Sequence, residues 1–174
     1  MASCLSGITH SFVVSKKGVF TSFDPAGAIS SLAATVIPSG AVVGAYPDSG
    51  GVGHGYLRSH GTFTTIDFPG AIFTFIGGSN PEGDSVGEYI DTAGVAHSFL
   101  LSNGVFRSFD PPGTGPNGSD ATGINPGGVI CWTLCRCVES GTRIYPDTVS
   151  QQNWPQFVGI LLMPLTSMCC SALG

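Results

Sequence analysis

Charged residues are scarce in this chain: they make up 10% of its 174 residues, and the formal net charge is −5. Binding to nucleic acid or to an anionic membrane requires a basic face, so this balance argues against both partners. Long apolar runs are also missing. The longest extends from Phe157 to Met163, far short of the ~20 residues that cross a bilayer. The sequence therefore predicts no nucleic-acid partner and no membrane partner.

The sequence begins without a recognisable secretory signal. Residues 1–10 lack a basic segment followed by a long apolar stretch, which such a signal requires. Two alternatives follow from this. Either the chain, as expressed, is cytoplasmic, or a signal is missing from this form of it.

Cysteine is absent from the middle of the chain and concentrated near its end. Five of the six cysteines lie after residue 130: Cys131, Cys135, Cys137, Cys169 and Cys170. The first three loosely resemble a set of metal ligands. However, no second pair with zinc-type spacing and no histidine in this segment supports a zinc site.

What the chain has in abundance is glycine, with 26 residues, arranged in a repeat. His10, His54 and His97 each open an apolar segment, at spacings of 44 and 43 residues. The positions that follow hold a turn glycine (Gly18, Gly61, Gly104), a phenylalanine (Phe20, Phe63, Phe106) and an aspartate (Asp24, Asp67, Asp110). The repeats cover about 10–53, 54–96 and 97–130, within a β-repeat domain of residues 1–130.

Each repeat reads as about four short strands joined by tight turns, because apolar and polar residues alternate and no helical period is sustained. A four-stranded unit of this length is typical of a β-propeller blade. The predicted fold is therefore all-β: a propeller-like array of about three four-stranded antiparallel blades, incomplete or closed by oligomerisation. Unpaired blade faces at both ends predict self-association.

The repeats resemble the bacterial HAF-type extracellular repeat family. The motifs that carry the resemblance are His-Ser/Gly-Phe/Tyr, Gly-Val-Phe, Phe-Asp-Pro, Gly-x-Tyr-x-Asp and the turn at residues 125–127. This resemblance implies a secreted or surface β-repeat protein and specifies no activity.

The repeat pattern stops near Cys131. It predicts Gly-x-Tyr-x-Asp and then a histidine, but the chain has Cys131-Trp132-Thr133 instead. A reading frame shifted by one base allows Gly, Tyr, Asp, His and Phe at the spacing of the second repeat, and the single Trp codon forces that glycine. Residues 131–174 are therefore interpreted as out of frame, so their cysteines, Trp132 and Trp154 are not read as a site. The alternative is a diverged terminal cap.

Residues that occur in every repeat are interpreted as structural. The histidines, the aspartates and the Tyr46/Tyr89 pair recur because every unit needs the same turn and hydrogen bonds. Residues that break the repeat are more informative about function.

The second repeat is unusually acidic. Glu82, Asp84, Glu88 and Asp91 lie within ten residues of each other. Carboxylates on a glycine-rich turn suit a hard cation, so Glu82, Asp84 and Asp91 are candidate ligands for Ca²⁺. The alternative is a solvated acidic turn.

Two candidate catalytic arrangements fall in the same segment. Ser85 lies in a G-x-S-x-G motif and precedes Asp91 and His97 in the order of an α/β-hydrolase triad, but it enters a strand and not a helix. The expected hairpin register places Ser85 and His97 on opposite faces, which argues against this triad. The same register pairs Glu88 with His97 across the strands, an arrangement that suits a general base. The alternative is an ordinary surface pair.

Two functions therefore remain open. The first is a calcium-assisted hydrolase of a small ester or lactone, such as an acyl-homoserine lactone, with Glu88 and His97 as catalytic residues. The second is a non-catalytic binding or structural β-repeat module that contacts glycans or protein partners.

Overall fold

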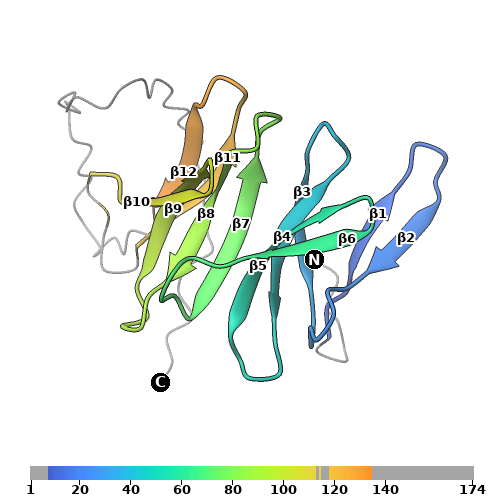
Figure 1. The fold of residues 1–174 in the computed structure, drawn as a ribbon, viewed down its shortest axis with the longest axis horizontal. Coiled ribbons are helices and arrows are strands. Elements are labelled where there is room, and N and C mark those ends of the chain that lie inside the picture. Colours follow the sequence, from blue (N-terminus) through green and yellow to red (C-terminus); the bar gives the residue numbers. More distant parts are fainter. Residues whose placement is uncertain (1–7, 113, 115–117, 135–174) are drawn as a thin grey trace, which may run out of the picture.

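A computed structural model describes residues 8–112, 114 and 118–134 of the chain. These residues form twelve strands and no helix, so they contain no helix that could cross a membrane. The predicted all-β class is confirmed (Figure 1). The strands are β1 (Ser11–Val14), β2 (Phe20–Phe23), β3 (Leu32–Val36), β4 (Val42–Pro47), β5 (Gly53–Ser59), β6 (Thr62–Ile66), β7 (Phe73–Ser79), β8 (Ser85–Ile90), β9 (Ala96–Ser102), β10 (Val105–Phe109), β11 (Ser119–Ile124) and β12 (Ile130–Leu134).

The central strands form two antiparallel meanders. The first has the order β3-β4-β5-β6, and the second has the order β7-β8-β9-β10. A single parallel pair, Gly53 with Phe73, joins them. Each meander straddles two sequence repeats, because the histidine that opens a repeat lies on its third strand.

The described chain has half a meander at each end. Strands β1 and β2 form a two-stranded sheet equivalent to β9 and β10. Strands β11 and β12 form another, equivalent to β7 and β8. Figure 1 shows these two hairpins at opposite ends of the array.

Two kinds of turn connect the strands. The Asp91–Val95 turn is closed by the Asp91 carboxylate, which accepts hydrogen bonds from the amides of Ala93 and Val95. Its fourth residue, Gly94, has a φ of 82°, a backbone conformation that favours glycine. The hairpin turns at His60–Gly61 and Asn103–Gly104 have positive φ at both residues, which matches the twist of the paired strands.

A β-bulge recurs at one position in β3, β7 and β11. The residue before the bulge pairs with Gly44 in the first meander, Gly87 in the second and Trp132 in the terminal hairpin. A Cβ atom at Gly87 would overlap the carbonyl oxygen of Phe75. Trp132 therefore occupies a position that requires glycine in both complete meanders.

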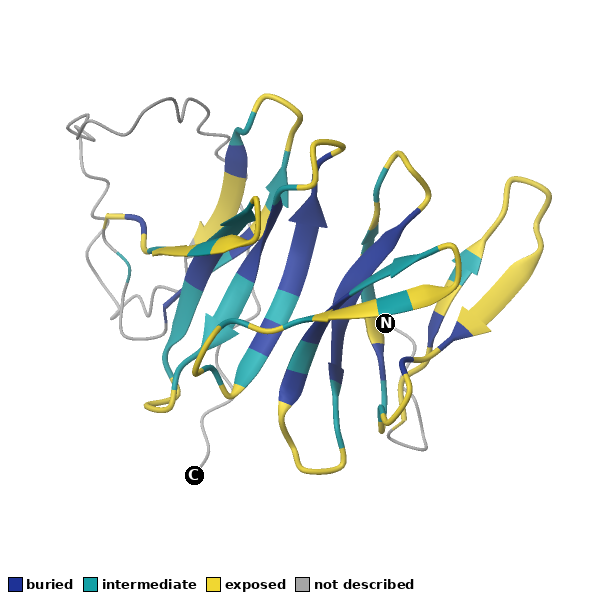
Figure 2. Ribbon diagram, in the orientation of Figure 1, coloured by how far each residue is buried: buried dark blue, intermediate teal, exposed yellow. Residues whose placement is uncertain are grey.

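In the described part of the chain the core consists of three separate apolar clusters, each between successive units (Figure 2). Tyr56 lies in the cluster against β1–β2, and Phe99 lies in the cluster between the two meanders; both are 0% exposed. Val86 lies in the third cluster, against β11–β12. Each unit therefore packs one face on the unit before it and the other face on the unit after it.

Candidate functional site

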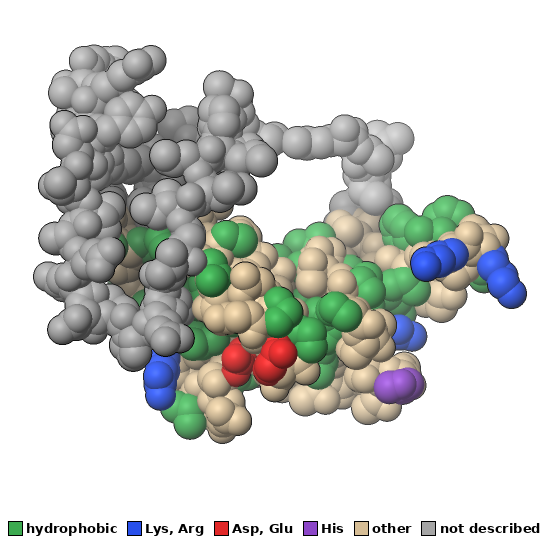
Figure 3. All heavy atoms as spheres, turned by 90° about the horizontal axis from the view of Figure 1, so that it is seen from above, with side chains coloured by type: hydrophobic (Ala, Val, Ile, Leu, Met, Phe, Trp, Pro, Cys, Tyr) green, Lys and Arg blue, Asp and Glu red, His purple; other side chains and the backbone are tan. Residues whose placement is uncertain are grey.

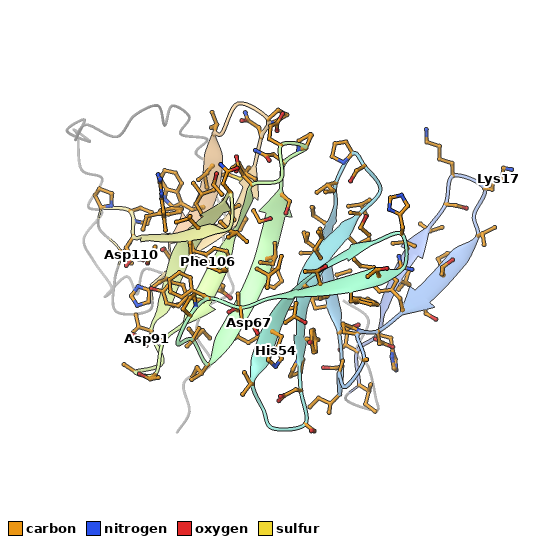
Figure 4. The ribbon with its side chains drawn as sticks, in the orientation of Figure 1. Lys17, His54, Asp67, Asp91, Phe106 and Asp110 are labelled. Atoms are coloured by element: carbon orange, nitrogen blue, oxygen red, sulfur yellow. The ribbon has the colours of Figure 1, made fainter. Side chains whose placement is uncertain are left out.

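A histidine and two aspartates of the second meander meet where β8 turns into β9. His97 lies on β9 between two carboxylates. Its Nδ1 is 2.8 Å from Asp110 Oδ2, and its Nε2 is 3.4 Å from Asp91 Oδ2. Figure 4 shows Asp91 and Asp110 at this end of the meander. Both imidazole nitrogens therefore face a carboxylate oxygen.

The first meander repeats this arrangement. His54 Nδ1 is 3.0 Å from Asp67 Oδ2, and His54 Nε2 is 3.4 Å from Asp48 Oδ2. At the β1–β2 hairpin, His10 Nδ1 is 2.8 Å from Asp24 Oδ2. The histidine–aspartate pair is thus a property of the repeat and is not confined to one copy.

The carboxylates change the acid–base behaviour of the histidines. The hydrogen bond to Asp110 is the largest influence on His97, and together with Asp91 it raises the histidine pKa against the opposing effect of burial. For His54, burial is the largest single effect and lowers the pKa, but Asp67 and Asp48 together outweigh it. In both sites the protonated ring can donate from both nitrogens.

Aromatic side chains hold these rings in place. The ring centroids of Tyr89 and His97 are 5.1 Å apart, and those of Tyr46 and His54 are also 5.1 Å apart. Phe68 stacks on Tyr89, with ring centroids 3.6 Å apart. Each imidazole is therefore held by an aromatic neighbour as well as by hydrogen bonds, with a stacked geometry at His97 and a tilted one at His54.

Buried serines extend the network into the core. Ser119 donates a hydrogen bond to Asp110 Oδ1 at 3.1 Å, and its hydroxyl lies 2.7 Å from that of Ser98. In the first copy, Ser31 donates to Asp24 Oδ1 at 2.6 Å. The aspartate thus links the imidazole to the following unit.

The structure corrects the expected hairpin register by one residue. Asp91 pairs with Val95 through its backbone amide, so His97 lies opposite Tyr89 and Glu88 lies opposite Ser98. A shift of one residue reverses the face of a side chain. Glu88 and His97 therefore project from opposite faces of the sheet, and the expected cross-strand pair does not form.

The observed register also changes the position of Ser85 relative to His97. Ser85 pairs with Leu101, so Ser85 and His97 share a face. Four residues of strand still separate their positions, which corresponds to about 13 Å. Ser85 is buried, and its hydroxyl lies 2.7 Å from that of Ser79. The structure does not bring Ser85, Asp91 and His97 together as a triad.

The predicted calcium ligands are divided between the two ends of β8. Glu82 is exposed in the β7–β8 loop, where Asp84 accepts a hydrogen bond from the Asn80 side-chain amide at 3.2 Å. Asp91 begins the loop at the other end, seven residues from Asp84 and about 23 Å away along the strand. Among the described residues, no three His, Cys, Asp or Glu side chains are grouped to hold a metal ion.

Glu88 has an environment unlike that of the other carboxylates. It lies on the face of the second meander that packs against β11, and burial raises its pKa to about 7, with a further contribution from the charge of Asp120. Burial also raises the pKa of Asp120, whose Oδ1 has no hydrogen-bond partner among the described residues. The first repeat has Ala45 at the position of Glu88.

Sequence reasoning recognised the recurrent histidines and aspartates but not their pairing. The signal was present in the constant spacing of 13 or 14 residues between each histidine and its aspartate, across one hairpin. The later tail cysteines and Trp154 lie outside the described residues.

Comparison with models of protein families, with curated proteins and with solved structures yields no match to this chain. The proposals below therefore depend on the geometry and on the repeat itself.

Proposed function

We propose that this chain is a structural β-repeat module of the extracellular type, whose units stack in a propeller-like array and bind further β-repeat units. The observation that carries this proposal is the engagement of His54 and His97 by carboxylates on both ring nitrogens. Because the histidine–aspartate pairs recur from unit to unit, they favour a structural role in which each pair holds its hairpin on the next unit.

The surface at the N-terminal end supports a binding role. Phe12 and Phe20 are 59% and 69% exposed on the β1–β2 hairpin. Figure 3 shows hydrophobic side chains at the surface at the end of the molecule that carries the lysine side chains, and Figure 4 places Lys17 in the β1–β2 turn. Contiguous exposed apolar side chains are a feature of interaction sites.

The mass of the protein in solution tests this function. We expect light scattering to show a mass that rises above 17.8 kDa, the mass of one chain, as the concentration increases. A mass of one chain at every concentration would contradict the proposal.

A second candidate function is the hydrolysis of a small ester or lactone, and Glu88 is the residue that favours it. A carboxyl group with a pKa of about 7 can both donate and accept a proton near neutral pH, as general acid–base catalysis requires. In this proposal Glu82 and Asp84 offer oxygen ligands to Ca²⁺ from the β7–β8 loop, while Ser85, Asp91 and His97 keep structural roles.

Hydrolysis of an ester and lactone panel, with calcium and then with excess chelator, tests this second function. We expect calcium-dependent activity to be lost in Glu88→Gln and retained in the control Lys17→Gln, whose side chain is exposed in the β1–β2 turn. Turnover that is unchanged in Glu88→Gln would remove Glu88 from the mechanism.

A further inference from the structure

The two ends of the described chain are complementary halves of one meander. Strands β11 and β12 correspond to the first two strands of the second meander, and β1 and β2 correspond to its last two. The order β11-β12-β1-β2 would therefore reproduce β7-β8-β9-β10. Within the described residues, β12 pairs only with β11 and β1 pairs only with β2, so one edge of each hairpin is open.

The register of the complete meanders specifies how the two open edges fit. In the first meander Val43 pairs with Leu57, and in the second Val86 pairs with Leu100. The equivalent residues in the terminal hairpins are Cys131 on β12 and Val13 on β1. Antiparallel pairing in the same register would therefore place Cys131 opposite Val13.

The apolar residues of β1–β2 fit the same arrangement. Phe12 corresponds to Tyr56 and Phe99, which are both 0% exposed. Phe99 packs together with Phe106 against Val43 and the residues around it. In the same arrangement Phe12 and its neighbour Phe20, with ring centroids 5.9 Å apart, would cover the equivalent face of another unit.

We propose that β1 of one copy pairs with β12 of a second copy, completing a composite four-stranded meander in a head-to-tail assembly. The inference rests on the proposed function, since it names the unit that the module binds and the strands that join. A second copy is the occupant because it supplies both missing strands in the correct order. Head-to-tail contacts are heterologous, so each copy keeps one open end for the next copy.

Disulfide trapping tests the register directly. Cys131 is exposed and forms no disulfide with another described residue. Residues directly opposite each other on paired strands have Cβ atoms close enough for a disulfide. The test uses the full chain in which Cys4, Cys135, Cys137, Cys169 and Cys170 are replaced by serine. Val13→Cys is added to this background, and Phe12→Cys serves as the matched control, because its side chain projects from the other face.

Mild oxidation followed by non-reducing electrophoresis gives the readout, and the mass of each variant is measured by light scattering. We expect the Val13→Cys band to shift from 17.8 kDa to multiples of that mass, while Phe12→Cys and the background do not shift to the same extent.

The other outcomes overturn the inference in distinguishable ways. Association without preferential cross-linking of Val13→Cys would refute this pairing and leave the proposed module intact. A disulfide within one chain would make the chain its own partner and refute a second copy as the occupant. A background protein with the mass of one chain at every concentration would refute both the pairing and the proposed function.

Discussion

Equivalent phenylalanines in different repeats should make very different contributions to stability. Phe99 is 0% exposed and lies among Val43, Ile76 and Phe106, whereas Phe12, at the same position of the first repeat, is 59% exposed. The perturbation is the replacement of each by alanine. Because the two residues share a strand position and a residue type, the comparison isolates the effect of burial by the preceding unit.

The burial of each phenylalanine sets the expected loss of unfolding free energy. Removal of a fully buried phenylalanine costs about 3–5 kcal/mol through lost apolar burial and the cavity that remains. Phe12→Ala should cost about 1 kcal/mol or less, because most of its ring is already in water. The unfolding free energy of a typical domain is about 5–15 kcal/mol, so Phe99→Ala removes a large fraction of this stability. We expect the Tm to decrease by roughly 10 °C.

Urea unfolding followed by circular dichroism measures both changes. The protein concentration is kept low, so that any assembly through β1–β2 does not bury Phe12. Equal losses of unfolding free energy in the two variants would refute the stacking of units deduced from the burial of Phe99.

The remaining predictions concern titrating groups and the recurrent bulge. The raised pKa of His97 stabilises the fold at pH values below the unfolded pKa of about 6.5, and this contribution is lost as pH rises through the folded pKa. We therefore expect His97→Asn to flatten the decline in unfolding free energy between about pH 6 and pH 8, and an unchanged slope in urea titrations would contradict this. Glu88 has a pKa of about 7 against an ordinary 4.5, so its ionisation destabilises the fold as pH rises from the lower of these values to the higher. Glu88→Gln should therefore increase the unfolding free energy by up to about 3 kcal/mol at pH values above 7 and by little at acid pH. A gain that does not depend on pH would count against burial of the carboxyl. Gly87→Ala should prevent the native β7–β8 pairing because its Cβ would meet the Phe75 carbonyl oxygen, whereas Gly127→Ala, whose nearest contact is a side-chain oxygen at 3.4 Å, should be tolerated; equal melting temperatures would refute the steric argument.

The fold class could be predicted from the sequence because the turn residues and apolar periods repeat. The asparagine, aspartate and glycine residues of the loops mark each reversal of the chain, as at Asp91–Gly94. The boundaries of the meanders could not be predicted in the same way. A sequence repeat can be divided at any point, and only strand pairing shows that the meander begins at β3 or β7.

The site could be predicted only in part, because a hairpin register depends on one backbone pair. Closure of the β8–β9 turn through Asp91 and Val95 moves every pair of this hairpin by one residue from the expected register. This difference moves Glu88 away from His97, whose imidazole faces Asp91 and Asp110, the residue that follows β10. The raised pKa of Glu88 depends on burial between units, which no local pattern encodes.

The division of the core into three clusters has a consequence for how the chain opens. Because a single parallel pair, Gly53 with Phe73, joins the meanders, units are coupled mainly by side-chain packing and behave as a linear series of neighbours. Loss of the first or last hairpin removes one cluster and leaves the others assembled. Amide hydrogen exchange should therefore be slowest in β8 and fastest in β2 and β12, as the array frays from its two ends inward.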